Sequence, residues 1–398
     1  MSERTVRPWR AALAGGILAT AGPVAGAEPD TVEDLERRVE QLEERLEATA
    51  EVAERAREGR AEKERRTHIG GYGELHYNNW DNRLAGGDDV DMLDFHRFVL
   101  FFGHEFTDDL RFDSELEVEH ALSGDGEPGE VELEQAYVEF DLNDRHRARG
   151  GLFLIPVGIL NDTHEPPTFY GVERNPVENN IIPTTWWAGG AALVGELAPG
   201  VSYDLAVHEG LKTSAADGFA VRDGRQKTAK ADASDLAYTT RLKWTGLPGL
   251  ELAGALQYQQ DITQDSGDNA GGATLYEAHA IWNNAGSAAQ RGFGLRALYA
   301  MWDLDGSGPE AVGADEQSGW YVEPSWKFGP SVGVFTRFSQ WDNRAGNGGD
   351  TEFDQWDVGL NYWPHPDVVI KADYQDQSSP AGSDEFDGFN LGIGYQFY

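Results

Sequence analysis

Apolar and polar residues alternate strictly along many short segments of this 398-residue chain. The clearest segment sets Leu110, Phe112, Ser114, Leu116 and Val118 against Arg111, Asp113, Glu115, Glu117 and Glu119. Successive side chains of a β-strand point to opposite faces, so this segment is predicted to be a strand with one apolar and one charged face. A shift of one residue would move all five charges to the apolar side. The pattern therefore specifies the register of the strand.

Similar segments can be laid along the chain after residue 68, and they begin near sixteen positions: 69, 92, 110, 130, 146, 190, 201, 235, 250, 274, 292, 319, 331, 353, 367 and 386. The connections between them are alternately short and long, as in bacterial outer-membrane barrels, which also have an even number of strands. No apolar run of about 20 residues follows the N-terminus, which excludes a bundle of transmembrane helices. A soluble β-sandwich is the alternative, but it predicts no such ordering. The sequence therefore predicts an all-β protein, a transmembrane antiparallel β-barrel of about 16 strands over residues 68–398, with an N-terminal α-helical coiled coil.

Residues 1–27 are predicted to be a secretory signal peptide. Arg4, Arg7 and Arg10 precede an apolar stretch over residues 11–21, and small residues stand before Glu28. Basic residues, a short apolar stretch and a small-residue cleavage site are the three parts of such a signal. The alternative, a transmembrane anchor, is disfavoured because the stretch is short and is interrupted by glycine and proline. We expect an exported protein of the Gram-negative outer membrane.

Residues 28–67 show a different, seven-residue repeat. Its two core positions hold Val32, Val39, Leu46 and Ala53 in one case and Leu35, Leu42, Thr49 and Ala56 in the other. Such a repeat is typical of an α-helical coiled coil. A single amphipathic helix is the alternative, because the seam weakens after Leu46. We expect this segment to lie in the periplasm ahead of the barrel.

Two motifs near the start of the predicted barrel resemble those of a known family. The segments GGYGELHY at residues 70–77 and DFHRFVLFFGHEF at residues 94–106 resemble the opening strands of phosphate-selective porins O and P. The resemblance extends over residues 69–398. It implies a sixteen-stranded barrel and a homotrimer with three separate pores. The partners that it implies are membrane lipids, lipopolysaccharide and small hydrophilic solutes or ions.

The longest connection, residues 158–189, is predicted to fold into the barrel and narrow its channel. Its position is that of the loop after the fifth strand, which has this role in porins of this size, and its prolines reduce the entropy lost on ordering. We expect it to pack on strands that are apolar on both faces, near Val99 and Phe153. An ordinary external loop is the alternative. The residues predicted at the constriction are Asp162, His164, Glu165, Glu173, Arg174 and Glu178.

The alternation also predicts which charged side chains line the pore: Arg97, Arg111, Asp113, Glu115, Glu117, Glu119, Arg241, Lys243, Arg296 and Arg337. Across all predicted inward positions acidic residues exceed basic ones, and the formal net charge of the chain is -37 at pH 7. We therefore predict a water-filled channel for passive diffusion of small hydrophilic solutes and ions, with a weak cation preference. The resemblance implies phosphate or oxyanion selectivity instead. Two further alternatives are a barrel that mainly tethers the outer membrane and an acidic bias that reflects salt adaptation.

Other kinds of chemistry find little support in the sequence. The strongly negative charge disfavours nucleic acid as a partner. No Gly-x-Ser-x-Gly motif or comparable nucleophile signature appears, so we expect no catalytic residues and no enzymatic activity. The pairing of His164 with Glu165, and of His120 with Glu117 and Glu119, lacks strong metal-ligand spacing. We therefore expect neither a metal site nor a cofactor.

Overall fold

The computed structural model describes residues 66–398, apart from residue 266 and residues 284–290, and separate residues between positions 32 and 49. The chain divides into two compact units, Met1–Lys63 and Glu64–Tyr398. The predicted signal peptide, residues 1–27, lies outside the described residues.

The described residues of the first unit are helical. They include Val39, Leu42 and Leu46, three apolar residues of the predicted coiled-coil seam, and all three side chains are exposed on the single chain. A coiled coil buries such a seam against another helix. Among the described residues of this unit no second helix covers the seam. The structure therefore supports a helix here, while the coiled coil stays a proposal.

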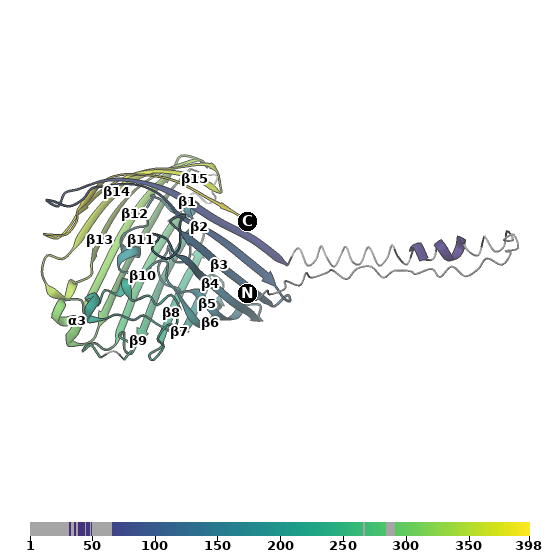
Figure 1. The fold of residues 1–398 in the computed structure, drawn as a ribbon, viewed down its shortest axis with the longest axis horizontal. Helices are drawn as coiled ribbons and strands as arrows, with labels where there is room; N and C mark the ends of the chain where they lie inside the picture. The colour runs from purple at the N-terminus through teal and green to yellow at the C-terminus, as the bar shows by residue number, and fades with distance from the viewer. Residues whose placement is uncertain are drawn as a thin grey trace, which may run out of the picture. The chain divides into compact units, whose positions relative to one another are not determined.

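The second unit is a closed antiparallel barrel of sixteen strands (Figure 1). Each strand pairs with the next along the chain, and β1 pairs with β16 from Gly71 opposite Phe397 to Asn82 opposite Phe386. This closure leaves the sheet without an edge strand. The predicted sixteen-stranded barrel is confirmed. The strands are β1 Thr67–Asn82, β2 Val90–Glu105, β3 Leu110–Glu119, β4 Val131–Asn143, β5 His146–Leu154, β6 Trp187–Ala198, β7 Val201–His208, β8 Ala237–Leu247, β9 Leu250–Gln259, β10 Ala273–Asn283, β11 Gly292–Leu304, β12 Glu316–Lys327, β13 Val332–Asp342, β14 Phe353–His365, β15 Val368–Ser378 and β16 Phe386–Phe397.

The outer face of the barrel is apolar, and its inner face is polar. On β8, Tyr238 and Leu242 are exposed on the outside, whereas Thr239 and Arg241 between them are buried inside the barrel. An apolar outer band around a polar interior is the arrangement that a strand barrel needs in a lipid bilayer. The predicted alternation of strand faces therefore holds in three dimensions.

The connections are alternately long and short along the chain, and the long ones carry short helical turns: η1 Pro166–Thr168, α2 Val177–Asn180, η2 Ala215–Asp217, η3 Val221–Gly224, α3 Ser307–Val312 and η4 Ala345–Asn347. No helix in the described part of the chain is long and apolar enough to cross a membrane. Two connections position the candidate site. We call residues 155–186 the lumen loop and residues 209–236 the β7–β8 loop.

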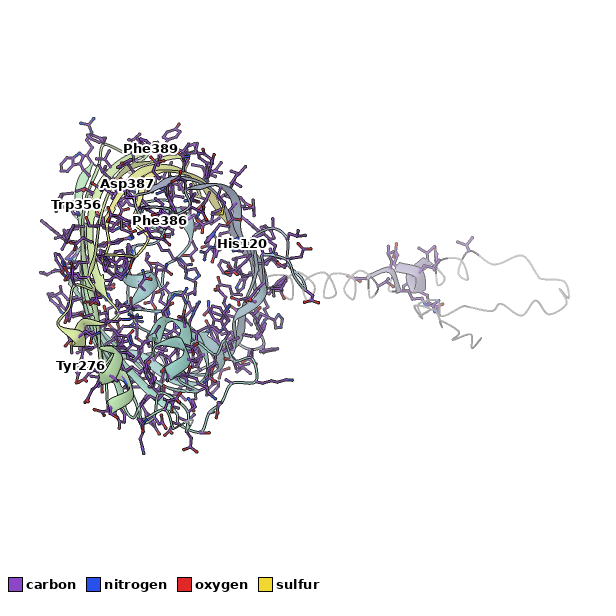
Figure 2. The ribbon with its side chains drawn as sticks, turned by 60° about the vertical axis from the view of Figure 1, so that its left-hand side comes forward. His120, Tyr276, Trp356, Phe386, Asp387 and Phe389 are labelled. Carbon is purple, nitrogen blue, oxygen red and sulfur yellow. The ribbon has the colours of Figure 1, made fainter. Side chains whose placement is uncertain are left out.

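The lumen loop lies inside the ring of strands (Figure 2). Its side chains Val157, Ile181 and Trp186 are almost fully buried, and they belong to one apolar cluster with Leu275 and Trp302 on the inner wall. Inward-facing alanines leave room for this cluster, because a small side chain lets the loop backbone approach the sheet closely. These are Ala206, Ala255, Ala273 and Ala300.

The wall on which the loop packs differs in part from our expectation. Phe153 belongs to the apolar cluster, as expected, but Val99 does not. Most of the wall contribution comes from β10 to β12, through residues such as Leu298 and Tyr321. On β11 the successive inward residues Leu298, Ala300, Trp302 and Leu304 are all apolar, so this strand is also apolar on both faces, although it was not among the strands expected to receive the loop.

Candidate functional site

The lumen loop is anchored to the barrel wall at the side formed by β1 and β15. The Glu173 carboxylate lies 3.0 Å from Nδ1 of His76 and accepts a hydrogen bond of 2.9 Å from Asn78. The backbone N–H of Val172 donates to the Asp373 carboxylate at 2.7 Å. Hydrogen bonds to an ionised acceptor are stronger than neutral ones, so these contacts hold the tip of the loop firmly.

Further anchors attach the loop to β11 and β12. The hydroxyl of Tyr321 on β12 donates to Glu178 at 2.9 Å. Arg296 on β11 donates to the backbone carbonyl of Thr168 at 2.8 Å. The loop leaves the wall at β5 and returns to it at β6, and its anchors on β11, β12 and β15 lie across the ring of strands from there. The loop therefore crosses the interior and narrows it.

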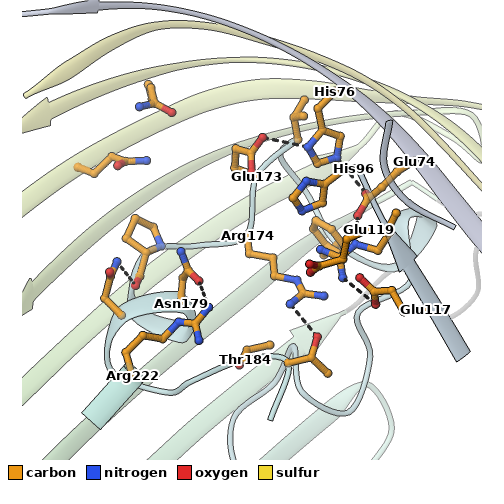
Figure 3. A pocket seen from close by; sticks show the side chains of 18 of the residues that line it. Glu74, His76, His96, Glu117, Glu119, Glu173, Arg174, Asn179, Thr184 and Arg222 are labelled. Carbon is orange, nitrogen blue, oxygen red and sulfur yellow. Dashed lines mark hydrogen bonds and ion pairs between the residues drawn. The ribbon is translucent and has the colours of Figure 1, made fainter. Parts of the chain in front are cut away.

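A cavity of about 350 Å³, the long-loop cavity, lies where the lumen loop faces the wall formed by β1 to β4 (Figure 3). The β7–β8 loop forms a third side of it through Arg222 and Arg225. Six carboxylates line this cavity: Glu74, Glu117, Glu119, Glu132, Glu134 and Glu173. Four guanidinium groups face them: Arg97, Arg174, Arg222 and Arg225.

Part of the acidic wall is paired with bases. Nε of Arg97 lies 2.8 Å from Glu74, and its Nη1 lies 4.0 Å from Glu117. The His76 ring lies between Glu74, at 3.1 Å, and Glu173, at 3.0 Å. Burial raises the pKa of Glu173, but the neighbouring His76 outweighs burial and holds this pKa at about 2. Glu173 is therefore ionised at neutral pH.

Among the described residues, the arginines supplied by the two loops are paired only with neutral groups. Arg174 donates to the Thr185 hydroxyl at 2.9 Å, Arg222 donates to Asn179 at 3.4 Å, and Arg225 donates to the backbone carbonyl of Thr185. Within the described part of the chain, Nε and Nη2 of Arg174 and Nε of Arg225 are buried without a hydrogen-bond partner. These three guanidinium groups, which we call the loop arginines, therefore direct their charge into the cavity.

Burial lowers the pKa of each loop arginine. It brings the pKa of Arg222 to about 10, and the nearby charge of Arg225 adds to this effect. The pKa of Arg174 is lowered by burial and then by Arg97, and that of Arg225 is lowered by burial. All three groups stay cationic at neutral pH, so the loop side of the cavity is basic while the strand side is acidic. Opposed walls of this kind create a field across the passage.

A second cavity of about 620 Å³, the short-turn cavity, lies at the other end of the barrel beside β3 to β8. Its basic side chains are Arg111, Arg145, Arg147, Arg149, Arg241 and Lys243, and its acidic ones are Asp141, Asp144, Glu196 and Asp204. Glu139 lies beside it and pairs with Arg111 and with Arg149, each at 2.8 Å. The excess of charge is therefore acidic in the long-loop cavity and basic in the short-turn cavity.

The structure brings two of the six predicted constriction residues into the long-loop cavity, namely Glu173 and Arg174. Asp162 is turned toward the short-turn end, where it pairs with Arg241 and, at 3.4 Å, with Lys243. Glu165 is half-buried and does not line either cavity.

The remaining two, His164 and Glu178, hold the loop in place instead of facing the passage. His164 is buried 3.4 Å from Glu115 on β3. Glu178 is fully buried and accepts hydrogen bonds of 2.6 Å from the backbone N–H groups of Ile159 and Leu160. An exposed and a buried carboxylate look alike in the sequence, and only the path of the loop separates them.

The predicted lining residues divide in the same way. Arg97, Glu117 and Glu119 line the long-loop cavity, and Arg111, Arg241 and Lys243 line the short-turn cavity. Asp113 and Arg296 line two smaller cavities. Glu115 lies beneath His164, and Arg337 is buried between Glu323, at 3.2 Å, and Asp357, at 3.0 Å. Glu115 and Arg337 therefore face inward without lining either of the two larger cavities.

Sequence reasoning missed the arginines of the β7–β8 loop. Lys227 of this loop pairs with Glu132 and, at 3.0 Å, with Glu130. These ion pairs hold the loop against the N-terminal end of β4. The available signal was the basic composition of residues 222–230 in an otherwise acidic chain. Composition alone, however, does not tell whether a loop folds over the barrel or away from it.

Comparison with known proteins agrees with this architecture. The family model of phosphate-selective porin O and P matches residues 68–398. An uncharacterized protein of Aquifex aeolicus is 32% identical over 346 residues, which cover 77% of this chain and 74% of that protein.

Two solved structures show the same fold. An anion-selective porin from Comamonas acidovorans aligns with a TM-score of 0.57 at 12% identity, over 83% of this chain and 100% of the porin. OmpT in its trimer form, an outer membrane protein of Vibrio cholerae, aligns with a TM-score of 0.53 at 10% identity, over 83% of this chain and 99% of OmpT. At such low identity the likeness concerns the fold alone.

Proposed function

We propose that this chain, which belongs to the phosphate-selective porin O and P family, is a general diffusion channel of the outer membrane. We further propose that the channel has a weak preference for cations. The supporting observation is the unequal charge of the long-loop cavity, where six carboxylates face four guanidinium groups. Charges at the narrowest level dominate ion choice, because charges more than about 8 Å away are screened at physiological salt. Most of the charge cancels across the cavity, so the preference is expected to be weak.

Single-channel recording tests this proposal. The purified protein in a planar bilayer should give stepwise increases in current as single channels insert. In a potassium chloride gradient, the zero-current potential should have the sign that results when potassium is slightly more permeant than chloride. A zero-current potential of the opposite sign would contradict the cation preference. A protein that inserts but passes no current would instead favour a tethering role.

Oxyanion selectivity is the second candidate, and the loop arginines are the observation that favours it. Arg174 and Arg225 have buried guanidinium nitrogens without a partner in the described part of the chain, and guanidinium groups match the oxygens of phosphate well. A porin of the same fold is described as anion-selective. Block of the potassium chloride current by low concentrations of inorganic phosphate would support this candidate.

We further propose a homotrimer embedded in membrane lipids and lipopolysaccharide, with the N-terminal coiled coil in the periplasm. A solved porin-like structure of the same fold is described in trimer form. Contacts between barrel walls bury a wide area. A helical seam of a few turns, whose core positions are not all apolar, contributes less free energy to association.

Deletion of residues 31–66 should therefore weaken the trimer only modestly. Mobility on an unheated gel in mild detergent measures this directly, with the full-length chain as reference. If the shortened protein ran as a monomer, the helical segment and not the barrel wall would be the principal trimer contact.

A further inference from the structure

Two histidines and an aspartate lie together beside the long-loop cavity: Asp94 and His96 from β2, and His120 from the loop that follows β3. Nδ1 of His96 lies 3.1 Å from Oδ2 of Asp94, and Nδ1 of His120 lies 2.8 Å from the same oxygen. One nitrogen of each ring and one carboxylate oxygen all lie within 4.8 Å of one another. Three donor atoms of the types that bind zinc are therefore grouped around one point.

A β-bulge explains how His96 comes to face the interior. On β2, Arg97 is opposite Glu74, but Asp94 is opposite His76, so two residues of β2 face the single residue Leu75 of β1. Such an extra residue reverses the facing of the side chains beyond it. Strict alternation from the inward-facing Arg97 would have placed both His96 and Asp94 on the lipid side.

The third residue reaches the group through an unusual backbone conformation. His120 is the first residue after β3, and its φ of 53° lies in the left-handed region. Its backbone N–H donates to the carbonyl of His96 at 3.2 Å. This hydrogen bond holds the start of the β3–β4 connection against β2 and keeps the His120 ring beside Asp94 (Figure 2).

The surroundings hold the ligands in place and leave them accessible. The His96 ring stacks on His76 with centroids 4.6 Å apart and an angle of 12° between the planes (Figure 3). Both nitrogens of His76 face carboxylates, Glu74 and Glu173, so His76 supports His96 and is not itself a ligand. The side chains of His96 and His120 are 30% and 33% exposed, and His96 lines the cavity.

From this geometry we propose that Asp94, His96 and His120 form a binding site for a divalent transition-metal ion such as Zn²⁺ at the long-loop mouth of the channel. Imidazole nitrogen and carboxylate oxygen are ordinary zinc ligands at about 2.0–2.2 Å, and three protein ligands leave a fourth position for water. The present distances from Asp94 are close to the ligand spacing around a tetrahedral ion. The site stands on these three residues and is independent of which ions the channel prefers.

Titration calorimetry of the refolded protein, purified without a histidine tag, tests the site with Zn²⁺ alone. Wild type should bind one Zn²⁺ per chain at this site. His96→Gln and His120→Asn should each weaken binding by at least about tenfold, the scale on which even indirect partners change metal affinity. Asparagine tolerates the left-handed backbone at position 120, so this variant removes the imidazole with little strain. Heat-dependent gel mobility verifies that each variant forms a barrel.

His365 provides a matched control. It is an exposed histidine 3.4 Å from Asp367, but it belongs to none of the potential metal-ligand groups in the described part of the chain. His365→Ala should leave the affinity for Zn²⁺ unchanged.

Ca²⁺, which takes oxygen ligands, should bind far more weakly than Zn²⁺. Equal Zn²⁺ affinity in wild type and in the His96→Gln, His120→Asn double variant would overturn the proposal, and so would equal affinity for Ca²⁺ and Zn²⁺.

Discussion

Replacing residues 163–181 by a short glycine-serine linker is expected to raise the single-channel conductance at least about twofold, because the narrowest lining of a channel sets its conduction. This segment carries the anchors to β1, β11, β12 and β15 and the side chains that face the acidic wall. Its removal leaves a barrel that is held together by its own strand pairing. Planar bilayer recording under identical salt measures the change.

A shortened β15–β16 connection is the control for this deletion. Residues 380–383 lie at the same end of the barrel and line neither cavity, so their removal should leave the conductance unchanged. Gel mobility before and after heating verifies that both deletions fold. If the step size of the 163–181 deletion equalled that of the wild type, the lumen loop would not be the constriction.

Replacing the loop arginines together by glutamine is expected to strengthen the preference for cations markedly. A unit charge about 8 Å from a passing ion contributes about 0.5 kcal/mol in a water-like medium, and screening by physiological salt reduces this to about 0.2 kcal/mol. Three such charges act with opposite sign on potassium and on chloride, so their removal changes the permeability ratio by about 1.2 kcal/mol, or about sevenfold. The change concerns Arg174, Arg222 and Arg225, whose partners in the described part of the chain are all neutral groups. The zero-current potential in a salt gradient reports the ratio.

Two further variants separate charge from shape. Lysine at the same three positions keeps the charge and should leave the zero-current potential close to that of wild type. Glu117→Gln with Glu119→Gln removes two wall carboxylates of the same cavity and should move the potential toward anions. If the glutamine and lysine variants behaved alike, the loop arginines would shape the passage without setting its field.

Much of the fold follows from local sequence pattern. The alternation of Leu110, Phe112 and Leu116 with Arg111, Asp113 and Glu117 is a property of neighbouring residues, and it specifies which face each side chain joins. The number of strands, their order and the alternately long and short connections follow from the same pattern. The physical reason is that the period of two along a strand needs no long-range information.

The candidate site depends on contacts that the sequence pattern does not contain. Glu173 and Glu178 are five residues apart in one loop, yet one lines the cavity and the other is fully buried among backbone N–H groups. Arg222 and Arg225 reach the same cavity from a different loop. Their placement is decided by how two loops fold into one barrel, which is a balance of packing and hydrogen bonding over long sequence separations.

The sequence by itself thus determined the barrel, its strand faces and the acidic and basic residues available to its interior. Only the tertiary structure decided which of these charges meet, and which side chains depart from the alternation. A single extra residue in β2 turns Asp94 and His96 inward, and the left-handed turn after β3 adds His120 to them. The alternation is local and survives any loop path, whereas the meeting of two charges depends on strand register, bulges and loop packing together.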